Sequence, residues 1–165
     1  MINKKMEKAI NGQINKEMYS AYLYLAMSAD ATHAGLKGAG KWFHVQFQEE
    51  MVHAMKFYNY LLEQGSAVEL ETLAKPKAGF KSLLAMFEAT LKHEQFITQS
   101  IHDLMALAIA EKDFASQILL QWYVNEQVEE EANDNEIIGM LKMAGSSGGT
   151  LLMLDRQLGK REFKG

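Results

Sequence analysis

Apolar side chains recur every three or four residues along four long stretches of the sequence, which is the spacing of one face of an α-helix. The stretches cover about residues 3–33, 41–64, 81–110 and 114–143. A shorter stretch of the same kind covers about residues 150–161. The pattern predicts an all-α protein with a single domain over residues 1–165, in which four long helices (about residues 3–143) form a bundle and a short fifth helix follows.

The segments between the predicted helices set the directions of those helices. Residues 34–40 are short and rich in glycine, so the second helix should return antiparallel to the first. Residues 65–80 contain Pro76 and show no sustained helical period. A helix of about 25 residues is ~38 Å long, and about sixteen extended residues reach at most roughly 55 Å. We therefore expect a crossover along the full bundle that makes the third helix parallel to the second.

The fifth predicted helix is amphipathic, with Leu151, Leu154 and Leu158 on its apolar face. Four helices already close a bundle, and an apolar face without a partner is unfavourable in water. We therefore expect this helix to pack on something other than its own bundle.

The apolar face of the second predicted helix is interrupted near its middle. Glu50 stands where a leucine would be expected, and His53 follows one turn later on the same side. The apolar positions around them are Phe43, Phe47, Ala54, Phe57 and Leu61. A bare carboxylate on a core face is costly unless it is paired or bound to a metal. A Glu-x-x-His pair alone is weak evidence, because chance spacing and a hydrogen-bonded core histidine are together the more common explanations.

The same interruption recurs along the chain, which strengthens the case. A shift of 77 positions carries Glu17 onto Glu94, Glu49 onto Glu126, Glu50 onto Gln127 and His53 onto Glu130. Apolar positions follow the same shift, so one helix pair is used twice. Two such hairpins packed together would bring six donor side chains to one height in the bundle. The sequence therefore predicts a metal site made by all four long helices.

The charge of this cluster matches two divalent cations. The six side chains are Glu17, Glu50, His53, Glu94, Gln127 and Glu130. Four carboxylates total −4 and the imidazole and amide are neutral, so the site is balanced with two metals and unbalanced with none. Glu50 and Glu130 are the natural bridging ligands. Oxygen-rich ligation with one imidazole suits iron or manganese, which can pass electrons to O2, whereas zinc would bind without redox chemistry.

Three neighbouring side chains have more than one interpretation. Tyr24 lies one turn beyond Ala21 on the inner face of the first predicted helix, and Trp122 precedes the polar residues of the fourth. Either ring could donate an electron or simply fill space, and packing is the expected role of Trp122. Met51 follows Glu50 and could be a core residue, an interface residue or a thioether ligand, with interface packing the preferred interpretation.

Composition excludes several other functions. The chain has 165 residues, 48% of them hydrophobic, and a formal net charge of −4, which gives no footprint for nucleic acid or an anionic membrane. No apolar run is long enough to span a bilayer. The sequence has no cysteine, so it has no disulfide and no iron–sulfur cluster. The beginning of the sequence lacks the apolar core of a signal peptide, and we therefore expect a cytoplasmic protein.

Two long motifs resemble those of the prokaryotic non-haem ferritins, and the similarity extends over the whole chain. The motifs and the matches beside them are Gln46-x-x-Glu49-Glu50-x-x-His53, Leu120-Gln121-Trp122-Tyr123-Val124-x-Glu126-Gln127-x-Glu129-Glu130-Glu131, Glu17, Lys92-His93-Glu94 and Leu154-Asp155-Arg156. The resemblance implies a ferritin-like bundle and a hollow homo-oligomeric shell of 24 subunits, with the fifth helix at its fourfold axis. It also implies oxidation of Fe(II) by O2 or hydrogen peroxide and storage of ferric oxyhydroxide mineral inside the shell.

The resemblance further assigns the iron positions. Residues matching Glu17, Glu50 and His53 hold one iron in such ferritins. Those matching Glu50, Glu94 and Glu130 hold the second, with Gln127 close by, and those matching Glu49, Glu126, Glu129 and Glu130 bind a weaker third iron on the cavity side. The candidate catalytic residues are Glu50, His53, Glu130 and Tyr24.

The outer three carboxylates also have an interpretation independent of the resemblance. Glu49, Glu126 and Glu129 lie outside the apolar stripes, so they should face away from the inner cluster. An isolated glutamate would be an ordinary surface acid. Three that converge beside Glu130 repel one another without a cation, which favours a weak, hydrated third metal position.

Related functions fit the sequence less well. A haem-bearing bacterioferritin has a second Glu-x-x-His where this chain has Gln127 and Glu130, so haem is disfavoured, although Met51 occupies the position of the haem ligand. A rubrerythrin-like peroxidase needs a cysteine-bound iron domain, and the mini-ferritins lack the fifth helix. The remaining alternatives are a di-iron oxidase without storage and a passive metal-binding or structural bundle.

Overall fold

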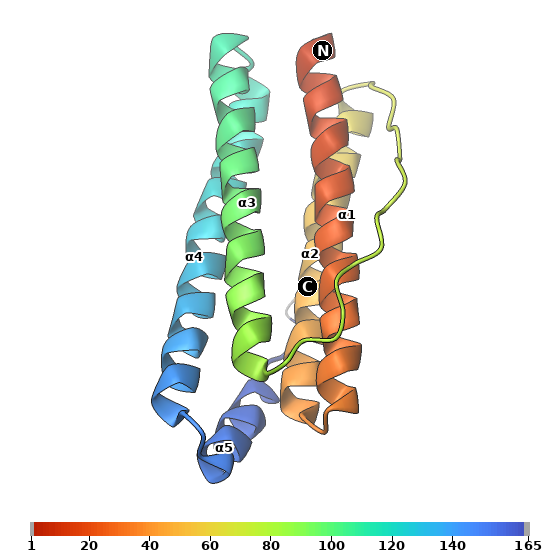
Figure 1. Cartoon of the computed structure of the whole chain (residues 1–165). Coiled ribbons are helices and arrows are strands. Elements are labelled where there is room, and N and C mark those ends of the chain that lie inside the picture. Colours follow the sequence, from red (N-terminus) through yellow and green to blue (C-terminus); the bar gives the residue numbers. More distant parts are fainter. Residues whose placement is uncertain (1, 164–165) are drawn as a thin grey trace.

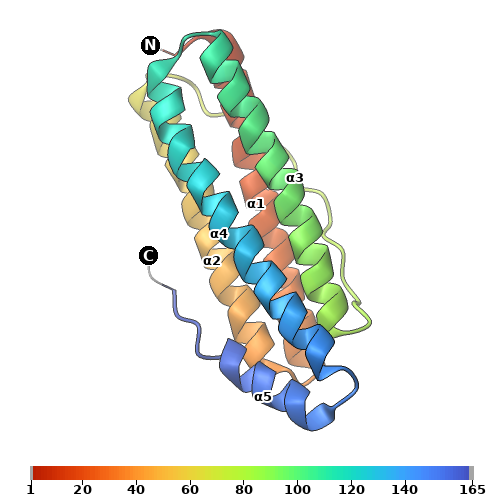
Figure 2. The same cartoon turned by 90° about the vertical axis from the view of Figure 1, so that its left-hand side faces the viewer.

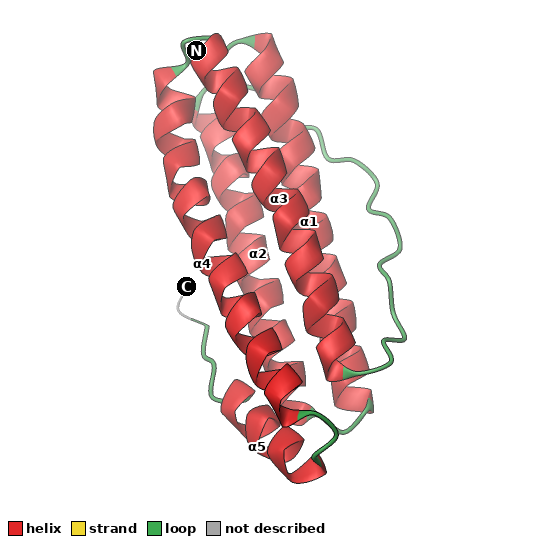
Figure 3. Ribbon diagram, turned by 60° about the vertical axis from the view of Figure 1, so that its left-hand side comes forward, coloured by secondary structure: helices red, strands yellow, loops and turns green. Residues whose placement is uncertain are grey.

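The computed structural model describes residues 2–163, and within that range every regular element is an α-helix (Figures 1 and 3). The helices are α1 (Lys4–His33), α2 (Lys37–Glu63), α3 (Leu83–Ala110), α4 (Phe114–Ala144) and α5 (Gly148–Leu158). The predicted all-α class, with four long helices and a short fifth, is confirmed. Met1 and residues 164–165 of the predicted domain lie outside the described residues. In the described part of the chain, no helix has the length and apolarity needed to cross a membrane.

The four long helices form two antiparallel hairpins, α1–α2 and α3–α4, which pack side by side (Figure 1). The segment between α2 and α3 runs along the outside of α1 from one end of the bundle to the other. As a result α3 runs parallel to α2, as the sequence predicts. This connection brings the middles of all four helices to the same height.

Hydrogen bonds fasten the crossover to α1. The side chain of Asn11 accepts from the backbone N–H of Glu69 at 2.8 Å and donates to the carbonyl of Ala67 at 3.1 Å. Near the other end, the backbone N–H of Gly79 donates to Asp30 at 2.6 Å. These contacts satisfy backbone groups that have no partner in a helix or sheet.

The interior has two apolar ends with a polar middle. One end includes Trp42, Phe43, Phe87, Ile137 and Leu158, and the other includes Ile10, Ile14, Phe57, Ile101 and Leu120. Buried polar side chains lie between these clusters on the same inner helix faces. The apolar ends supply the burial that stabilises the bundle and so leave the middle free to hold charged groups.

The structure corrects the predicted start of the second helix. We expected a turn over residues 34–40 and a helix from Lys41, but α2 begins at Lys37. Gly38 and Gly40 therefore lie inside the first turns of the helix. A Cβ on Gly38 would lie 1.7 Å from the carbonyl oxygen of Asp155, and one on Gly40 would lie 2.2 Å from the Thr32 hydroxyl. These glycines allow close packing and do not form the turn.

The prediction that the fifth helix packs away from its own bundle is wrong. Helix α5 ends at Leu158, three residues before the expected position, and lies across the end of the bundle (Figure 2). Leu158 is buried, and Leu151 and Leu154 are partly buried against the same apolar cluster. The outward-facing apolar residues of α5 are Leu152 and Met153, which are 52% and 71% exposed.

Asp155 of α5 caps the N-terminus of α2. Its two carboxylate oxygens accept from the backbone N–H groups of Gly38 at 3.1 Å and Ala39 at 2.8 Å. The first N–H groups of a helix have no partner within the helix, and a negative charge there also interacts favourably with the helix dipole. The residue before α2, Leu36, has no side-chain oxygen that could do this. Asp155 therefore supplies a cap that the local sequence lacks.

Substitution of Gly38 tests this docking. We expect Gly38→Ala to lower the thermal unfolding midpoint (Tm), because overpacking against Asp155 costs about 1–3 kcal/mol. The matched control is Gly12→Ala, since Gly12 lies within α1 and has open space around it. Alanine at position 12 should raise stability by up to about 1 kcal/mol. A Gly38→Ala protein that melts like the wild type would contradict the close contact.

Candidate metal centre

Each long helix contributes one buried glutamate to the polar middle of the bundle. Glu17, Glu50, Glu94 and Glu130 come from α1, α2, α3 and α4, and none is more than 4% exposed. His53 and Gln127, also predicted from the sequence, are buried beside them. The structure therefore brings all six predicted inner residues into one buried region.

The carboxylates of Glu17 and Glu50 and the imidazole of His53 form one compact group. Each offers an atom that lies within 4.8 Å of the others, and His53 Nδ1 is 3.4 Å from Glu50 Oε2. Gln13 donates a hydrogen bond of 2.8 Å to Glu17 Oε1. Within residues 2–163, Glu17 Oε2 is buried and has no hydrogen-bond partner. Such an oxygen is available to a cation.

Gln46 links the two glutamates that we expected to bridge the metals. Its side-chain Nε2 donates to Glu50 Oε1 at 3.2 Å and to Glu130 Oε2 at 2.9 Å. One amide thus holds carboxylates from α2 and α4 toward each other. Gln46 belongs to the sequence motif but was not predicted as a site residue. The available signal was its position one turn before Glu50 on the inner face.

Two side chains orient Glu94. The hydroxyl of Tyr24 donates to Glu94 Oε1, and Gln127 Nε2 donates to Glu94 Oε2 at 3.0 Å. Tyr24 is fully buried, and burial raises its pKa well above the ordinary value. It is therefore a neutral hydrogen-bond donor to a candidate ligand.

Trp122 and Met51 lie at the border of the cluster. The indole of Trp122 packs edge-on against His53 with ring centroids 5.4 Å apart, and the Lys56 ammonium lies 3.8 Å from the indole centroid. These contacts agree with a packing role for Trp122. Met51 is partly exposed on α2.

Burial makes the ionised form of the cluster unfavourable. Burial, reinforced by the charge of Glu50, raises the pKa of Glu17 to about 8. Burial and the neighbouring Glu94 raise the pKa of Glu130 to about 7. Burial also raises the pKa values of Glu50 and Glu94. Burial therefore favours the protonated form of each of these carboxyl groups, and a bound cation would compete with those protons.

Asp134 is a further buried acid that we did not include in the predicted site. It lies one turn beyond Glu130 on α4, and its side chain is only 1% exposed. Neither carboxylate oxygen has a hydrogen-bond partner among residues 2–163. Burial, with repulsion from Glu94 and Glu130, raises the pKa of Asp134 to about 9. Its register with the inner stripe of α4 was the signal that could have identified it.

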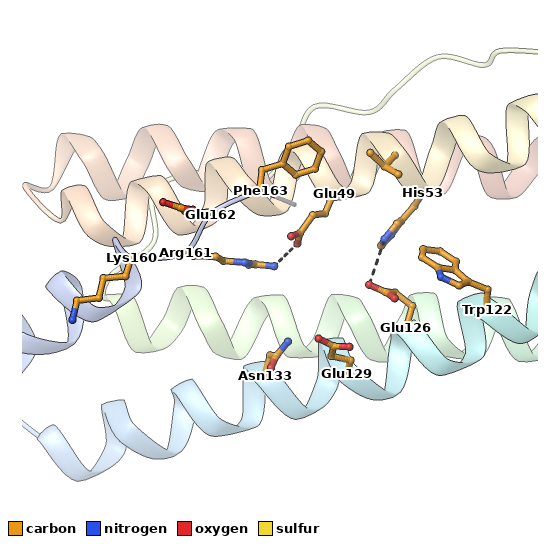
Figure 4. Close-up of a pocket in the computed structure, with 11 residues that line it drawn as sticks. Glu49, His53, Trp122, Glu126, Glu129, Asn133, Lys160, Arg161, Glu162 and Phe163 are labelled. Atoms are coloured by element: carbon orange, nitrogen blue, oxygen red, sulfur yellow. Dashed lines mark hydrogen bonds and ion pairs between the residues drawn. The ribbon is translucent and has the colours of Figure 1, made fainter. Parts of the chain in front are cut away.

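The three outer carboxylates lie around one pocket of about 580 Å³ beside α2 and α4 (Figure 4). Glu129 is exposed, whereas Glu49 and Glu126 are partly buried. His53 connects this pocket to the inner group, because its Nε2 is 3.9 Å from Glu126 Oε1. Ligand atoms of His53, Glu126 and Glu130 also lie within 4.8 Å of one another. Glu49 contacts Arg161, a partner that the sequence did not indicate.

A four-helix bundle with inward carboxylates from every helix, and a histidine among them, resembles the class of bundles that hold metal ions between their helices. The chain belongs to the ferritin family, whose family model, described as a ferritin-like domain, matches residues 7–144. Its sequence is 44% identical to a bacterial non-heme ferritin of Campylobacter jejuni over 158 residues, which are 96% of this chain and 95% of the relative. It is 39% identical to the bacterial non-heme ferritin of Escherichia coli O157:H7, covering 96% of each.

Solved structures agree with this assignment. An open-pore ferritin from the archaeon Archaeoglobus fulgidus superposes with a TM-score of 0.97 at 46% identity, covering 98% of this chain and all of that one. A humanized archaeal ferritin superposes with a TM-score of 0.99 at 45% identity, with both chains fully covered. The full-length coverage confirms the predicted resemblance.

The unpaired carboxyl of Asp134 gives a pH-dependent prediction. Its pKa is 3.8 in an unfolded chain and about 9 in the fold, so the folded state binds the extra proton between these values. Stability of the metal-free protein should therefore fall as pH rises from about 4 to 9. Asp134→Asn removes this titrating group. The free energy of unfolding of the variant should therefore exceed that of the wild type by an amount that grows with pH, on the order of 1 kcal/mol per pH unit.

Thermal unfolding of metal-free protein at pH 5, 6, 7 and 8 measures this difference. Asn135→Asp, on the exposed face of the same helix, is the control for a change of one charge. A constant Tm difference between Asp134→Asn and the wild type across this range would contradict the prediction.

Proposed function

We propose that this chain is an iron-storage subunit that oxidises Fe(II) with O2 at the buried centre of its helix bundle. The observation that carries the proposal is the convergence of four buried glutamates, one from each long helix, with a histidine from α2. Membership in the ferritin family and full-length similarity to bacterial non-heme ferritins support it. Fe(II) is here a substrate, and the product is ferric iron.

The compact group of Glu17, Glu50 and His53 supports one inner iron position, and similarity to bacterial non-heme ferritins supports a second. Glu17, Glu50 and His53 would hold one ion. Glu50, Glu94 and Glu130 would hold the other, with Gln127 beside it. Two Fe(II) ions would balance the charge of the four carboxylates, whose pKa values burial raises, so metal binding would compete with proton binding. Each ion gives one electron to O2 on oxidation.

The surrounding residues position these ligands. Gln46 holds Glu50 and Glu130 at a fixed separation through its two hydrogen bonds. Tyr24 donates a hydrogen bond to one carboxylate oxygen of Glu94, and Gln127 donates one to the other. Such contacts reduce the reorganisation needed when substrate ions bind and are oxidised. Tyr24 acts here as a hydrogen-bond donor to Glu94, and any electron donated by its ring would go to iron or O2 at this centre.

A third iron position would use Glu49, Glu126, Glu129 and Glu130 at the pocket beside α2 and α4. Glu49, Glu126 and Glu129 are more exposed than the inner set, which favours a weaker and more hydrated ion. Because His53 lies between the two sets, an ion there would be next to the inner pair. It could supply a further electron to O2 or pass onward as oxidised iron.

We also propose that copies of this chain assemble into a closed homo-oligomeric shell, with 24 subunits, that holds the mineral. Large apolar side chains remain on the surface of the single chain, including Phe114, Ile118 and Met153, each more than 70% exposed. Phe114 and Ile118 lie one turn apart on α4, and Met153 lies on α5. Exposed apolar groups of this size are typical of subunit interfaces.

Removal of the bridging carboxylate tests the inner centre. We expect Glu50→Ala to lower the initial rate of Fe(II) oxidation by about 100-fold or more, since even second-shell changes cost up to about 100-fold. Stopped-flow absorbance under air measures the rate, and size-exclusion chromatography checks assembly. Glu63→Ala, at the exposed end of α2, is the control. Native oxidation by assembled Glu50→Ala protein would place the reaction elsewhere.

Removal of an outer carboxylate tests the third position separately. Glu126→Ala and Glu129→Ala should keep the fast first oxidation, because the inner ligands stay intact. The ratio of Fe(II) oxidised to O2 consumed, and the recovery of activity for a second addition of iron, should both change. Glu136→Ala, an exposed acid farther along α4, should leave both unchanged. Loss of the first fast phase would assign Glu126 or Glu129 to the inner centre.

A further inference from the structure

The segment that follows α5 covers the pocket of the outer carboxylates. After Leu158 the chain leaves the end of the bundle and turns back toward its middle (Figure 2). Residues 160–163 form one wall of the pocket, and Glu49, Glu126 and Glu129 lie on the other walls (Figure 4). The C-terminal segment and the proposed third iron position therefore share one space.

Arg161 is the residue of this segment that enters the pocket. Its Nη2 donates to Glu49 Oε2, and its guanidinium lies 4.3 Å from the centroid of the Trp42 ring. Trp42 is itself only 5% exposed, so the guanidinium rests on a rigid part of the core. The Arg161 side chain is 20% exposed, and Glu49 is 26% exposed. An arginine held by both a ring and a carboxylate has a more defined position than one in a typical surface ion pair.

The positive charge of Arg161 acts on the acidic cluster as a bound cation would. Burial raises the pKa of Glu49, and attraction to Arg161 opposes that rise. Arg161 also lowers the pKa values of Glu130 and Asp134 against the effect of burial. Its second terminal nitrogen, Nη1, is buried without a hydrogen-bond partner in the described part of the chain. The charge of Arg161 therefore acts on at least three of the acids around it, Glu49, Glu130 and Asp134.

We propose that Arg161 is a built-in competitor for the third cation position, which it occupies through Glu49 whenever iron is absent. A divalent ion that binds Glu49 and Glu126 must displace the guanidinium from Glu49, so Arg161 weakens the outer site and favours release of iron from it. The inference rests on the proposed function of the outer carboxylates. It assigns to the C-terminal segment the control of how long iron stays beside the inner centre.

Equilibrium binding of Co²⁺ to the assembled, iron-free protein tests the proposal, because O2 does not oxidise this ion under ordinary conditions. Isothermal titration calorimetry separates the inner class of sites from the weaker outer class. Arg161→Gln should tighten the outer class about fivefold, the order expected for loss of a partly exposed ion pair, and leave the inner class unchanged. Lys160→Gln removes the same charge from the neighbouring exposed residue and should change the outer class less than twofold.

A second substitution tests whether Arg161 acts through Glu49. In the background of Glu49→Gln, Arg161→Gln should no longer tighten the outer class, because the two residues act through one contact. Outer binding that is unchanged or weaker in Arg161→Gln would overturn the proposal, and a weaker outer class would make Arg161 a support for Glu49. An outer class that is absent from the wild type but present in Arg161→Gln would support it strongly.

The same titration distinguishes a failure of the proposed function from a failure of the role of Arg161. If the wild-type protein shows no inner class of Co²⁺ sites, the proposed function is contradicted. Intact inner and outer classes that do not respond to Arg161→Gln would contradict only the role of Arg161. Circular dichroism and chromatography of each variant establish that its fold and assembly are retained before binding is compared.

Discussion

Everything in this bundle depends on placing several carboxylates inside a protein core. Glu17, Glu50, Glu94 and Glu130 are almost completely removed from water, and Asp134 is buried close to them. Charged groups in such surroundings are stable only with counter-ions or protons. The raised pKa values express that requirement in the absence of metal. A divalent cation bound among these carboxylates would meet the same requirement.

The fold meets this constraint by placing apolar packing at the two ends of the helices and the acids between them. Apolar clusters at both ends supply the packing, and the acids occupy only the middle. The crossover along α1 makes α2 parallel to α3, so residues from both hairpins meet at one height (Figure 1). Hydrogen bonds from Gln46, Tyr24 and Gln127 then hold acids that the apolar ends do not touch. Neither the apolar clusters nor these hydrogen bonds alone would support a charged centre.

Periodicity identified most of the fold and the inner residues because each of those features repeats. Glu50 was recognisable from its place in an apolar stripe, and the shift that relates the two hairpins extended the argument to Glu94 and Glu130. Gly38 and Gly40 were assigned to a turn because a glycine carries the same signal in a turn and in a close helix contact. The contact with Asp155 that distinguishes them joins residues 117 positions apart. Arg161 and Glu49 likewise lie 112 positions apart with no shared pattern, so the sequence alone did not connect them.

The cap that Asp155 provides for α2 has a consequence for how the chain is made. Synthesis proceeds from the N-terminus, so the α1–α2 hairpin leaves the ribosome long before residue 155 exists. Until α5 arrives, the N–H groups of Gly38 and Ala39 must bond to water, and the first turn of α2 has no partner to fix it. Helix α2, which is made early, is therefore capped by Asp155, which is made late. A chain cut short before α5 would keep all six inner residues of the candidate centre, but the N-terminus of α2 would lack its cap.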